Sequence, residues 1–549
     1  MKKILLFSAI LSSFMWFSSC DPENVIDNEN KDTDTLDYVW DETKVIDVKL
    51  NNTSIECSSP NVSINGQNAV ITKKGTYKLS GTLENGQIVV NASGIVRLLL
   101  NNVNITSQTT SAIYIADAKR AIIFLPEGTD NTITDGPNYV MTADSINSTI
   151  YSRDYMAIAG NGKLTVNANY NSAISSRDEL IIESGDITVN SVGLGIKGKD
   201  YLIINGGKFN IKSGGDGLKS DKDSTENEGF IEINNGEFDI VSDQDAISAQ
   251  TELRIKNGTF RITTGGGSNF TSDLISAKGL KSQDRITIEN GGFTLDCADN
   301  IIDADNHLTI NGGNFVLSSG NKPLDSDSTL TINGGTVQII KSVKGISSHR
   351  IAVNGGLVTV LSRNDCMKAS LGAELTTDDG SSISINGGMV TLSSDKGDAL
   401  DSNGSILISG GAVTVQGSAT KPDDAVSYRS TFKINGGSFY AAGATSLLPQ
   451  TDSEQNSLAV SFSIIQPPGQ IFCIQTEAGA TVAVFKATRY SYFFMTSIPA
   501  LQTGQTYHLY TGGTVTGTDM GGYYADGVYT PGTKKTTFTV SQKVTSIKL

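Results

Sequence analysis

The chain has 549 residues, and its 57 glycines, 11 prolines and 7% aromatic content fit many short strands joined by tight turns better than helices. This length exceeds what one hydrophobic core needs, so an elongated repeat or several domains is expected. A formal net charge of −15 argues against a nucleic-acid partner, and three widely separated histidines leave little material for a zinc site or a catalytic triad.

Residues 1–19 have the layout of a secretory signal peptide: two lysines, an apolar stretch and then small residues. Ser18 and Ser19 stand directly before Cys20 and resemble a lipobox. We therefore expect Cys20 to be lipidated and to become the first residue of the mature protein, with lipid as the only contact to a membrane. The alternative is an ordinary signal peptide followed by a coincidental cysteine.

Residues 20–44 are acidic and poor in apolar side chains, and such a segment cannot bury enough surface to fold. We expect a solvated tether between the lipid and the rest of the chain. The acidic residues directly after Cys20 also resemble the surface-export signal of Bacteroidetes lipoproteins. This resemblance implies an exported lipoprotein on the outer face of the outer membrane.

A regular repeated pattern begins near residue 160. Weaker copies of it come earlier in the chain, at 75–90, 95–106 and 112–126. Each copy reads apolar, any, apolar, Asn-Gly-Gly, any, Phe or Val, any, apolar, as in LIINGGKFNI at 202–211. The base period is about 22 residues, with loop insertions in the longer steps, and self-similarity at this length predicts a solenoid. The glycine shared by all copies falls at positions 162, 185, 207, 236, 258, 291, 313, 335, 356, 388, 411 and 437.

The apolar residues within each copy alternate, so the copies are predicted to be strands. No stretch between copies carries a helical period, and the repeat is too short for a four-stranded propeller blade. We therefore predict an all-β fold, with a right-handed parallel β-helix over residues 45–449 whose coils each contain three short strands. Residues 450–549 break the period, and we expect a small β-rich domain there that covers the last coil.

The repeat also predicts which side chains stack inside the coils. The isoleucine three positions before the shared glycine should form one inward column, and the phenylalanine two positions after it should form another. We interpret the aromatic column as core packing and not as a sugar-binding platform. The asparagine before the glycine should form an amide ladder along the axis. The two apolar columns contain Ile204, Ile310, Ile332, Ile385, Phe209, Phe238, Phe260, Phe293 and Phe315.

A second element recurs between these copies, in which a small residue precedes an apolar residue and a polar residue follows it. If the apolar residue points inward, the residues one and three positions later point outward on the same side. The first of these positions contains Lys197, Lys219, Ser248, Lys281, Asp303, Asp325, Ser347, Lys368 and Asp401. The second contains Arg153, Arg177, Lys199, Asp221, Asp305 and Asp327.

The acidic part of these ladders predicts a calcium site. Neighbouring coils are about 4.8 Å apart, so four carboxylates would share one small patch, and like charges at that spacing repel unless they are protonated or share a cation. Calcium, which takes six to eight oxygen ligands, suits such a patch. The alternative is a solvated acidic face. The candidate ligands are Asp303, Asp305, Asp325 and Asp327, with a weaker second cluster of Asp216, Asp221, Asp243 and Asp245.

The same face turns basic towards the N-terminal coils. A stripe of cations, with calcium beside it, would suit a chain of carboxylated sugars, because both contact carboxylates. Asp154 and Asp178 directly follow two of the cations, so an ordinary charge-paired surface is the alternative. The candidate ligand-binding residues are Arg153, Arg177, Lys197, Lys199 and Lys219.

Residues 50–549 resemble a family of bacterial carbohydrate-binding β-helix proteins first described from a cellulose-degrading clostridium. The resemblance implies a right-handed β-helix similar to pectate lyases, bound calcium and affinity for plant polysaccharides, including acidic ones. The GDG-type element matches at Asp216, Gly217, Lys219 and Asp221, and no catalytic residue is carried over. The matching stretches are GTYKLSGTLENGQIVV (75–90), TDNTITDG (129–136), GGDGLKSD (214–221), the INGG repeats and LQTGQTYHLYTGG (501–513).

Three functions are consistent with these patterns. The first is a non-catalytic, calcium-containing cell-surface protein that binds acidic or plant cell-wall polysaccharides. The second is a calcium-dependent polyuronate lyase of the pectate type, which needs an arginine or lysine as base; Lys197, Lys219 and Lys281 lie on a suitable face, but nothing in the sequence favours an uncharged lysine there. The third is an adhesin that presents residues 450–549 to a protein partner. The sequence leaves the oligomeric state open.

Overall fold

The computed structural model describes residues 35–140, 146–223, 227–270, 276–372 and 377–549. The expected signal peptide, Cys20 and residues 21–34 of the expected tether lie outside these ranges. The chain divides into two units, Met1–Val39 and Trp40–Leu549. Within the described part of the first unit there is a short 3-10 helix, η2 (Thr35–Tyr38). No helix in the described ranges is long and apolar enough to cross a membrane.

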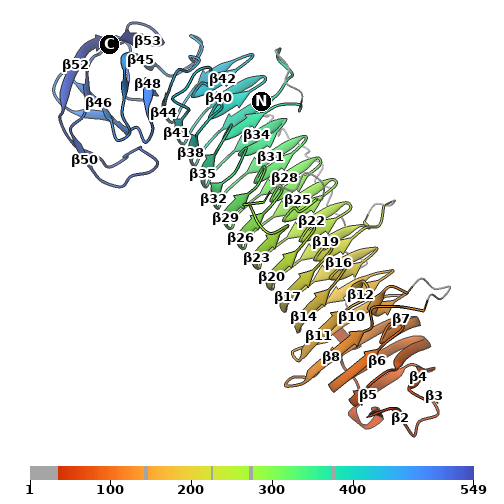
Figure 1. The fold of residues 1–549 in the computed structure, drawn as a ribbon. Coiled ribbons are helices and arrows are strands. Elements are labelled where there is room, and N and C mark those ends of the chain that lie inside the picture. The colour runs from red at the N-terminus through yellow and green to blue at the C-terminus, as the bar shows by residue number, and fades with distance from the viewer. Residues whose placement is uncertain (1–34, 141–145, 224–226, 271–275, 373–376) are drawn as a thin grey trace, which may run out of the picture. The chain divides into compact units, whose positions relative to one another are not determined.

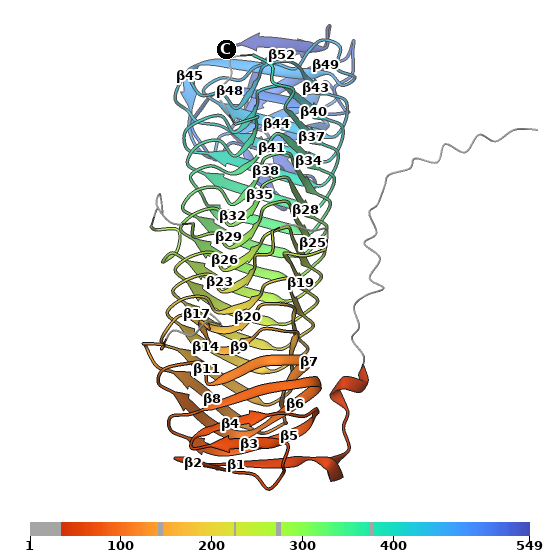
Figure 2. The same ribbon diagram turned by 90° about the vertical axis from the view of Figure 1, so that its right-hand side faces the viewer.

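The second unit is all-β and consists mainly of short parallel strands that pair at a constant interval (Figures 1 and 2). A typical coil contains β16 (Tyr201–Ile204), β17 (Lys208–Ser213) and β18 (Leu218–Ser220). Each of these strands pairs in parallel with the third strand after it in the chain. This pairing stacks coils of three strands along one axis, which is the strand order of a solenoid. We call the three stacks column 1, column 2 and column 3, after β16, β17 and β18 respectively.

The stacked strands have the following bounds. Column 1 contains β10 (Met156–Gly160), β13 (Leu180–Ile182), β16, β19 (Phe230–Ile233), β22 (Glu252–Ile255), β25 (Arg285–Ile288), β28 (His307–Ile310), β31 (Thr329–Ile332), β34 (Arg350–Val353), β37 (Ser382–Ile385), β40 (Ser405–Ile408) and β43 (Phe432–Ile434). Column 2 contains β11 (Lys163–Ala168), β14 (Asp186–Ser191), β17, β20 (Glu237–Ser242), β23 (Thr259–Thr264), β26 (Gly292–Cys297), β29 (Asn314–Ser319), β32 (Thr336–Lys341), β35 (Leu357–Ser362), β38 (Met389–Ser394), β41 (Ala412–Gln416) and β44 (Ser438–Gly443). Column 3 contains β9 (Ser148–Ser152), β12 (Ser172–Ser176), β15 (Ile196–Gly198), β18, β21 (Ile247–Ala249), β24 (Leu280–Ser282), β27 (Ile302–Ala304), β30 (Leu324–Ser326), β33 (Ile346–Ser348), β36 (Met367–Ala369), β39 (Leu400–Ser402) and β42 (Val426–Tyr428).

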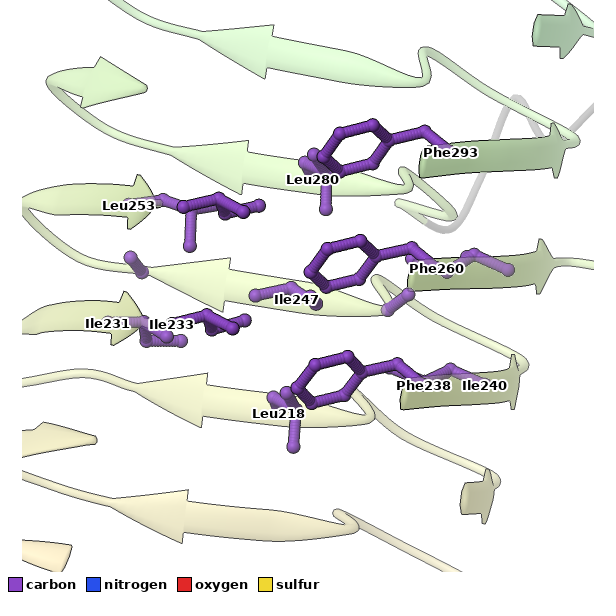
Figure 3. Close-up of a cluster of buried hydrophobic side chains, with 14 of the residues drawn as sticks. Leu218, Ile231, Ile233, Phe238, Ile240, Ile247, Leu253, Phe260, Leu280 and Phe293 are labelled. Carbon is purple, nitrogen blue, oxygen red and sulfur yellow. The ribbon is translucent and has the colours of Figure 1, made fainter. Parts of the chain in front are cut away.

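The inward columns predicted from the repeat form the core. The five phenylalanines of column 2 stack with ring centroids 4.5–4.8 Å apart and interplanar angles of 1–3°. This spacing matches the distance between parallel strands, so each coil contributes one ring (Figure 3). Ile204, Ile310, Ile332 and Ile385 are fully buried in column 1. The interpretation of the aromatic column as core packing is therefore confirmed.

The Asn-Gly corners give the stack a second, polar ladder. The amide of Asn333 donates to Asn311 at 2.7 Å, and Asn354 donates in turn to Asn333 at 2.8 Å. The glycine at the corner has a positive φ, as at Gly313 with φ 103°, where an added Cβ would lie 2.9 Å from the carbonyl oxygen of Gly291. Glycine is required there both for its conformation and for the close approach of the coils. The predicted amide ladder is confirmed.

The N-terminal coils are less regular and contain the longest strands. β1 pairs in parallel with β5 and antiparallel with β2, while β3 and β4 form a further antiparallel pair. These pairings leave short, turned-back strands at this end of the stack, and such strands protect a sheet edge from further pairing. The N-terminal elements are η3 (Glu42–Lys44), β1 (Ile46–Asn52), β2 (Ser54–Glu56), β3 (Val62–Asn65), β4 (Asn68–Ile71), β5 (Gly75–Leu83), β6 (Gln87–Ser107), β7 (Ile113–Leu125) and β8 (Asp130–Asp135).

The strands after residue 450 lie at the other end and pair antiparallel, apart from the parallel pair of β45 (Ser457–Gln466) and β53 (Val544–Lys548). The last coil strand, β44, pairs antiparallel with β48, so its free edge is covered. Arg489 bonds to Asp395 at 2.6 Å, and Gln416 donates to the carbonyl oxygen of Gly521, so this region also contacts column 2. Its strands are β45 (Ser457–Gln466), β46 (Ile471–Thr476), β47 (Thr481–Lys486), β48 (Ser491–Ser497), β49 (Thr506–Thr511), β50 (Thr514–Thr516), β51 (Val528–Thr530), β52 (Thr533–Thr539) and β53 (Val544–Lys548).

Candidate functional site

The outer side of column 3 contains both of the polar ladders. Strand pairing places the first ladder in one continuous row, from Lys197 opposite Lys219 to Lys368 opposite Asp401. In the second ladder, the amide of Arg177 donates to Ser152 and that of Lys199 donates to Ser176, so consecutive coils carry these cations. The repeat therefore aligns the side chains as their spacing predicts.

The four carboxylates of the first predicted calcium cluster have different environments. Asp303 accepts hydrogen bonds from the ammonium group of Lys278 and from the amide of Asn300 at 3.0 Å. Asp325 bonds to Lys322 at 2.9 Å and to the same Asn300 amide at 3.1 Å. The charge of each of these two carboxylates is therefore balanced by a lysine. Lys278 lies two positions before Leu280 of β24, and Lys322 lies two positions before Leu324 of β30.

The outer two carboxylates of this cluster, Asp305 and Asp327, are exposed. The amide of Asp327 donates to the carbonyl oxygen of Asp305 at 3.3 Å, so the two residues lie on consecutive coils. Partial burial raises the pKa of Asp305, and the charges of Asp303 and Asp327 raise it further. Like-charge repulsion is thus present at this outer pair.

The second predicted calcium cluster is also divided among lysines. Asp216 bonds to Lys219 at 2.7 Å and Asp221 bonds to Lys197 at 2.5 Å. Asp245 lies 3.2 Å from the ammonium group of Lys281. Throughout the described part of the chain, no three acidic, histidine or cysteine side chains gather in a way that could hold a metal ion. As placed, the carboxylates therefore suit ammonium groups better than calcium, and calcium stays a prediction.

The ion-pair ladder continues into the C-terminal coils. Lys368 lies 3.4 Å from Asp365 and 2.9 Å from Asp401, while Asp398 accepts the amide of Asp424 at 2.5 Å. One lysine thus faces several carboxylates. Burial raises the pKa of Asp398 to about 6, against the hydrogen bond from Asp424, and the nearby charges of Asp401 and Asp365 contribute to this rise.

We expect Asp398→Asn to stabilise the protein at pH 7 and to have little effect at pH 4. The folded-state pKa of about 6 lies above the ordinary value of 3.8, so the folded protein takes up the extra proton. The stabilisation from this proton is fully present below the pKa of Asp398 in the unfolded chain. It is lost as the pH rises through the pKa of Asp398 in the folded protein. Asparagine keeps an acceptor for the amide of Asp424 and carries no charge. With allowance for solvent screening, the gain in free energy of unfolding at pH 7 should be about 1–2 kcal/mol, measured by denaturant titration. An equal gain at both pH values would contradict this account.

The basic end of the same face is hollowed. The hollow has a volume of about 380 Å³ and is lined from β9, β12 and β15 and by the residue after β18. This volume falls in the range of about 300–1,000 Å³ that is typical of ligand sites. Its lining includes Tyr151, Ser172, Arg177, Lys197, Lys199 and Asp221.

Three of the five predicted ligand-binding residues line this hollow, namely Arg177, Lys197 and Lys199. The other two do not: Arg153 is exposed one coil earlier, and Lys219 bonds to Asp216. Arg177 and Lys199 form no ion pair with any residue that the structure describes. At this hollow the surface is therefore not fully charge-paired, as the alternative interpretation would require.

Sequence reasoning did not identify Ser172 or Tyr151 as part of the site, and it assigned Asp221 to a calcium cluster. Ser172 begins β12, and Tyr151 lies opposite Ser175 in the strand pairing. Tyr151 is 3% exposed and packs against Tyr114 at a centroid distance of 5.9 Å, so it forms the floor of the hollow. The small residues of β12 leave the space that larger side chains would fill.

The stacked coils, with a cationic hollow on their outer face, have the features of a carbohydrate-binding protein. A family model described as "Carbohydrate-binding domain-containing protein" matches residues 65–323 and 324–447, and the chain belongs to this family. The resemblance seen in the sequence is thus confirmed at the level of the family. The match ends before the strands that follow residue 450.

Two individual proteins are similar to parts of the chain. A carbohydrate-binding domain-containing protein of Acetivibrio thermocellus is 34% identical over 197 residues, which is 35% of this chain and 65% of that protein. The chain thus spans slightly less than two thirds of this relative. A solved structure, titled polysaccharide lyase-like protein from C. thermocellum, gadolinium derivative, is 33% identical and covers 44% of this chain and 96% of its own, with a TM-score of 0.41.

Proposed function

We propose that the protein binds an acidic polysaccharide, without catalysis, on the outer face of column 3 of a right-handed parallel β-helix. The cationic hollow is the observation that carries this proposal. Arg177 and Lys199 offer charged donors on consecutive coils, and neither is paired within the described ranges. Guanidinium and ammonium groups bind the carboxylates of sugar acids with charge-assisted hydrogen bonds. Membership of the carbohydrate-binding family supports a sugar polymer as the partner.

The proposed location is the cell surface. The signal-like segment 1–19 and Cys20 support export and lipid anchoring, and the acidic residues that follow support the outer face of the outer membrane. On this proposal, residues 20–44 tether the sugar-binding coils to the anchor. Such a tether would let the coils reach a polymer that cannot approach the membrane closely.

Calcium is proposed at the exposed outer pair, Asp305 and Asp327. Two carboxylates supply only part of the six to eight oxygens that calcium takes, so water and the carboxylates of the polymer would complete the shell. The repulsion that raises the pKa of Asp305 would be relieved by the ion. Calcium would then strengthen polymer binding more than it strengthens the fold.

Binding is preferred over lyase activity because of the state of the lysines. A lysine that acts as base must lose its proton near neutral pH. Burial opposes the charge of Lys219, but the hydrogen bond and the charge of Asp216 outweigh burial and raise its pKa. Lys197 and Lys281 also form ion pairs, with Asp221 at 2.5 Å and with Asp245 at 3.2 Å. A lysine held in an ion pair with a carboxylate is not suited to abstracting a proton.

The test is titration of polygalacturonate into residues 21–549, which include the whole of the second unit, followed by calorimetry. We expect binding that weakens with salt and is at least about tenfold weaker in Arg177→Gln/Lys199→Gln, because each lost contact involves a charged donor. Repeating the titration in calcium and in chelator, with Asp305→Asn/Asp327→Asn, tests the calcium part.

A matched control removes two lysines from column 2. Lys208 and Lys212 are exposed on β17, and Lys208→Gln/Lys212→Gln makes the same change in net charge. This control should bind polygalacturonate as the original chain does. Absence of binding to any acidic polymer would refute the proposed function, and unsaturated products absorbing in the near ultraviolet would favour the lyase instead. Equal affinity in calcium and in chelator would refute the calcium site.

A further inference from the structure

Two polar atoms at the cationic hollow lack hydrogen-bond partners within the described structure. One is the hydroxyl oxygen of Ser172, a residue that is 1% exposed, and the other is Oδ1 of Asp221. Both residues line the hollow. Buried polar atoms are nearly always hydrogen-bonded, and an unpaired one is unfavourable for the free protein. Their position beside the unpaired cations indicates that a ligand supplies the missing partners.

The chemistry of these atoms restricts the ligand. The other oxygen of Asp221, Oδ2, bonds to the ammonium group of Lys197 at 2.5 Å, which fixes the orientation of the carboxylate. An ionised carboxylate only accepts hydrogen bonds, so the partner of Oδ1 must be a donor. A serine hydroxyl both donates and accepts. Sulfate and acetate carry no donor for Asp221 at neutral pH, whereas a sugar hydroxyl does.

The order of the residues along the stack places cations that can bind a carboxylate beside an acceptor that can bind a hydroxyl group. The amide of Lys199 donates to Ser176, and that of Lys222 donates to Lys199, so Arg177, Lys199 and Asp221 follow one another on consecutive coils. Parallel strands lie about 4.8 Å apart, so two cations and one acceptor span roughly 10 Å. One end of this row suits a carboxylate and the other end suits a hydroxyl.

We propose that the hollow is a subsite for a uronate unit, whose carboxylate binds Arg177 and Lys199 while a hydroxyl donates to Asp221 and bonds to Ser172. This inference rests on the proposed function and adds the residues that select a sugar acid over other anions. The cations attract any polyanion, and the two unpaired acceptors demand hydroxyl groups at a defined place. Selectivity for uronates over anions that carry no hydroxyl group follows from this division.

The experiment is calorimetric titration of trigalacturonate into residues 21–549, with acetate and sulfate as competitors that carry no hydrogen-bond donor. We expect Ser172→Ala to weaken trigalacturonate binding about tenfold and to leave attraction to poly(styrene sulfonate), a polyanion without hydroxyl groups, unchanged. Asp221→Asn should weaken trigalacturonate binding more strongly. Ser457→Ala is the matched control, since Ser457 is also a 1% exposed serine with an unpartnered hydroxyl but lies in β45. It should bind trigalacturonate as the original chain does.

The outcomes separate this subsite from the proposed function. If Ser172→Ala and Asp221→Asn bind trigalacturonate normally while Arg177→Gln/Lys199→Gln does not, the hydroxyl contacts are wrong and acidic-polymer binding stands. If sulfate or acetate competes as well as galacturonate does, the selectivity is wrong. If the unaltered chain binds no acidic polymer, the proposed function fails, and the subsite fails with it.

Discussion

Phe260→Ala is expected to lower the free energy of unfolding by about 3–5 kcal/mol, which is the usual cost of emptying a buried aromatic site. Phe260 is 1% exposed and lies between Phe238 and Phe293, with ring centroids 4.8 Å away on both sides. Its removal opens a cavity that the rigid spacing of the coils prevents from collapsing, and it breaks two ring contacts of about 0.5–1.5 kcal/mol each. The loss should therefore fall near the upper end of the range.

The effect should also be local. In a stack where each coil contacts only its neighbours, stability is a sum of coil and interface terms. Hydrogen exchange in Phe260→Ala should accelerate most in β20, β23 and β26, and least in β41 and β44. Phe270→Ala is the control, because Phe270 is 61% exposed and its removal should change the free energy of unfolding by less than about 0.5 kcal/mol. Uniform acceleration along the whole stack would contradict the nearest-neighbour account.

The stacked core and the alignment of the ladders could be predicted because the repeat has a physical consequence. When coils of similar length pair in parallel, residues at the same place in the repeat must lie one above another. Phe209 and Phe315 are more than 100 residues apart in the sequence, yet they belong to one stack because every step between them is in register. The same argument placed Lys197, Lys219 and Asp303 in one row.

The ion pairs could not be predicted from the same reasoning. The sequence analysis considered only the positions that follow the buried residue of each strand in column 3. Lys278 and Lys322 instead come two positions before that buried residue. Their side chains reach the ladder because the turn that enters the strand runs along the same outer face. Turn geometry is not recorded in the alternation of apolar residues, so the sequence did not show that Asp303 and Asp325 pair with lysines.

The region after residue 450 was hard to predict for another reason. It has no repeat, so no register fixes which residues meet. Arg489 and Asp395 bond at 2.6 Å although 94 positions separate them, and Tyr440 of the last coil stacks on Tyr523 at 5.2 Å. Contacts of this kind arise from the packing of loops, which the composition alone does not specify.

Lys278→Met is expected to lower the free energy of unfolding by about 3 kcal/mol, because it leaves a buried carboxylate without its counter-ion. Asp303 is 8% exposed, and it also accepts a hydrogen bond from the amide of Asn300 at 3.0 Å. The measurement is denaturant unfolding of residues 21–549. Lys278→Met/Asp303→Leu should recover most of the loss, since replacing both members of a buried pair by apolar side chains is often neutral.

The same variant shows whether lysine takes the place that calcium was expected to occupy. In Lys278→Met, the carboxylates of Asp303 and Asp325 face each other with one ammonium group fewer between them. If Lys278 acts as an internal counter-ion, millimolar calcium should raise the melting temperature of Lys278→Met by more than that of the original chain. The apolar double variant should not respond at these positions. An equal response of all three proteins would show that calcium binds elsewhere, and a single variant as stable as the original chain would show that the ion pair contributes no net stability.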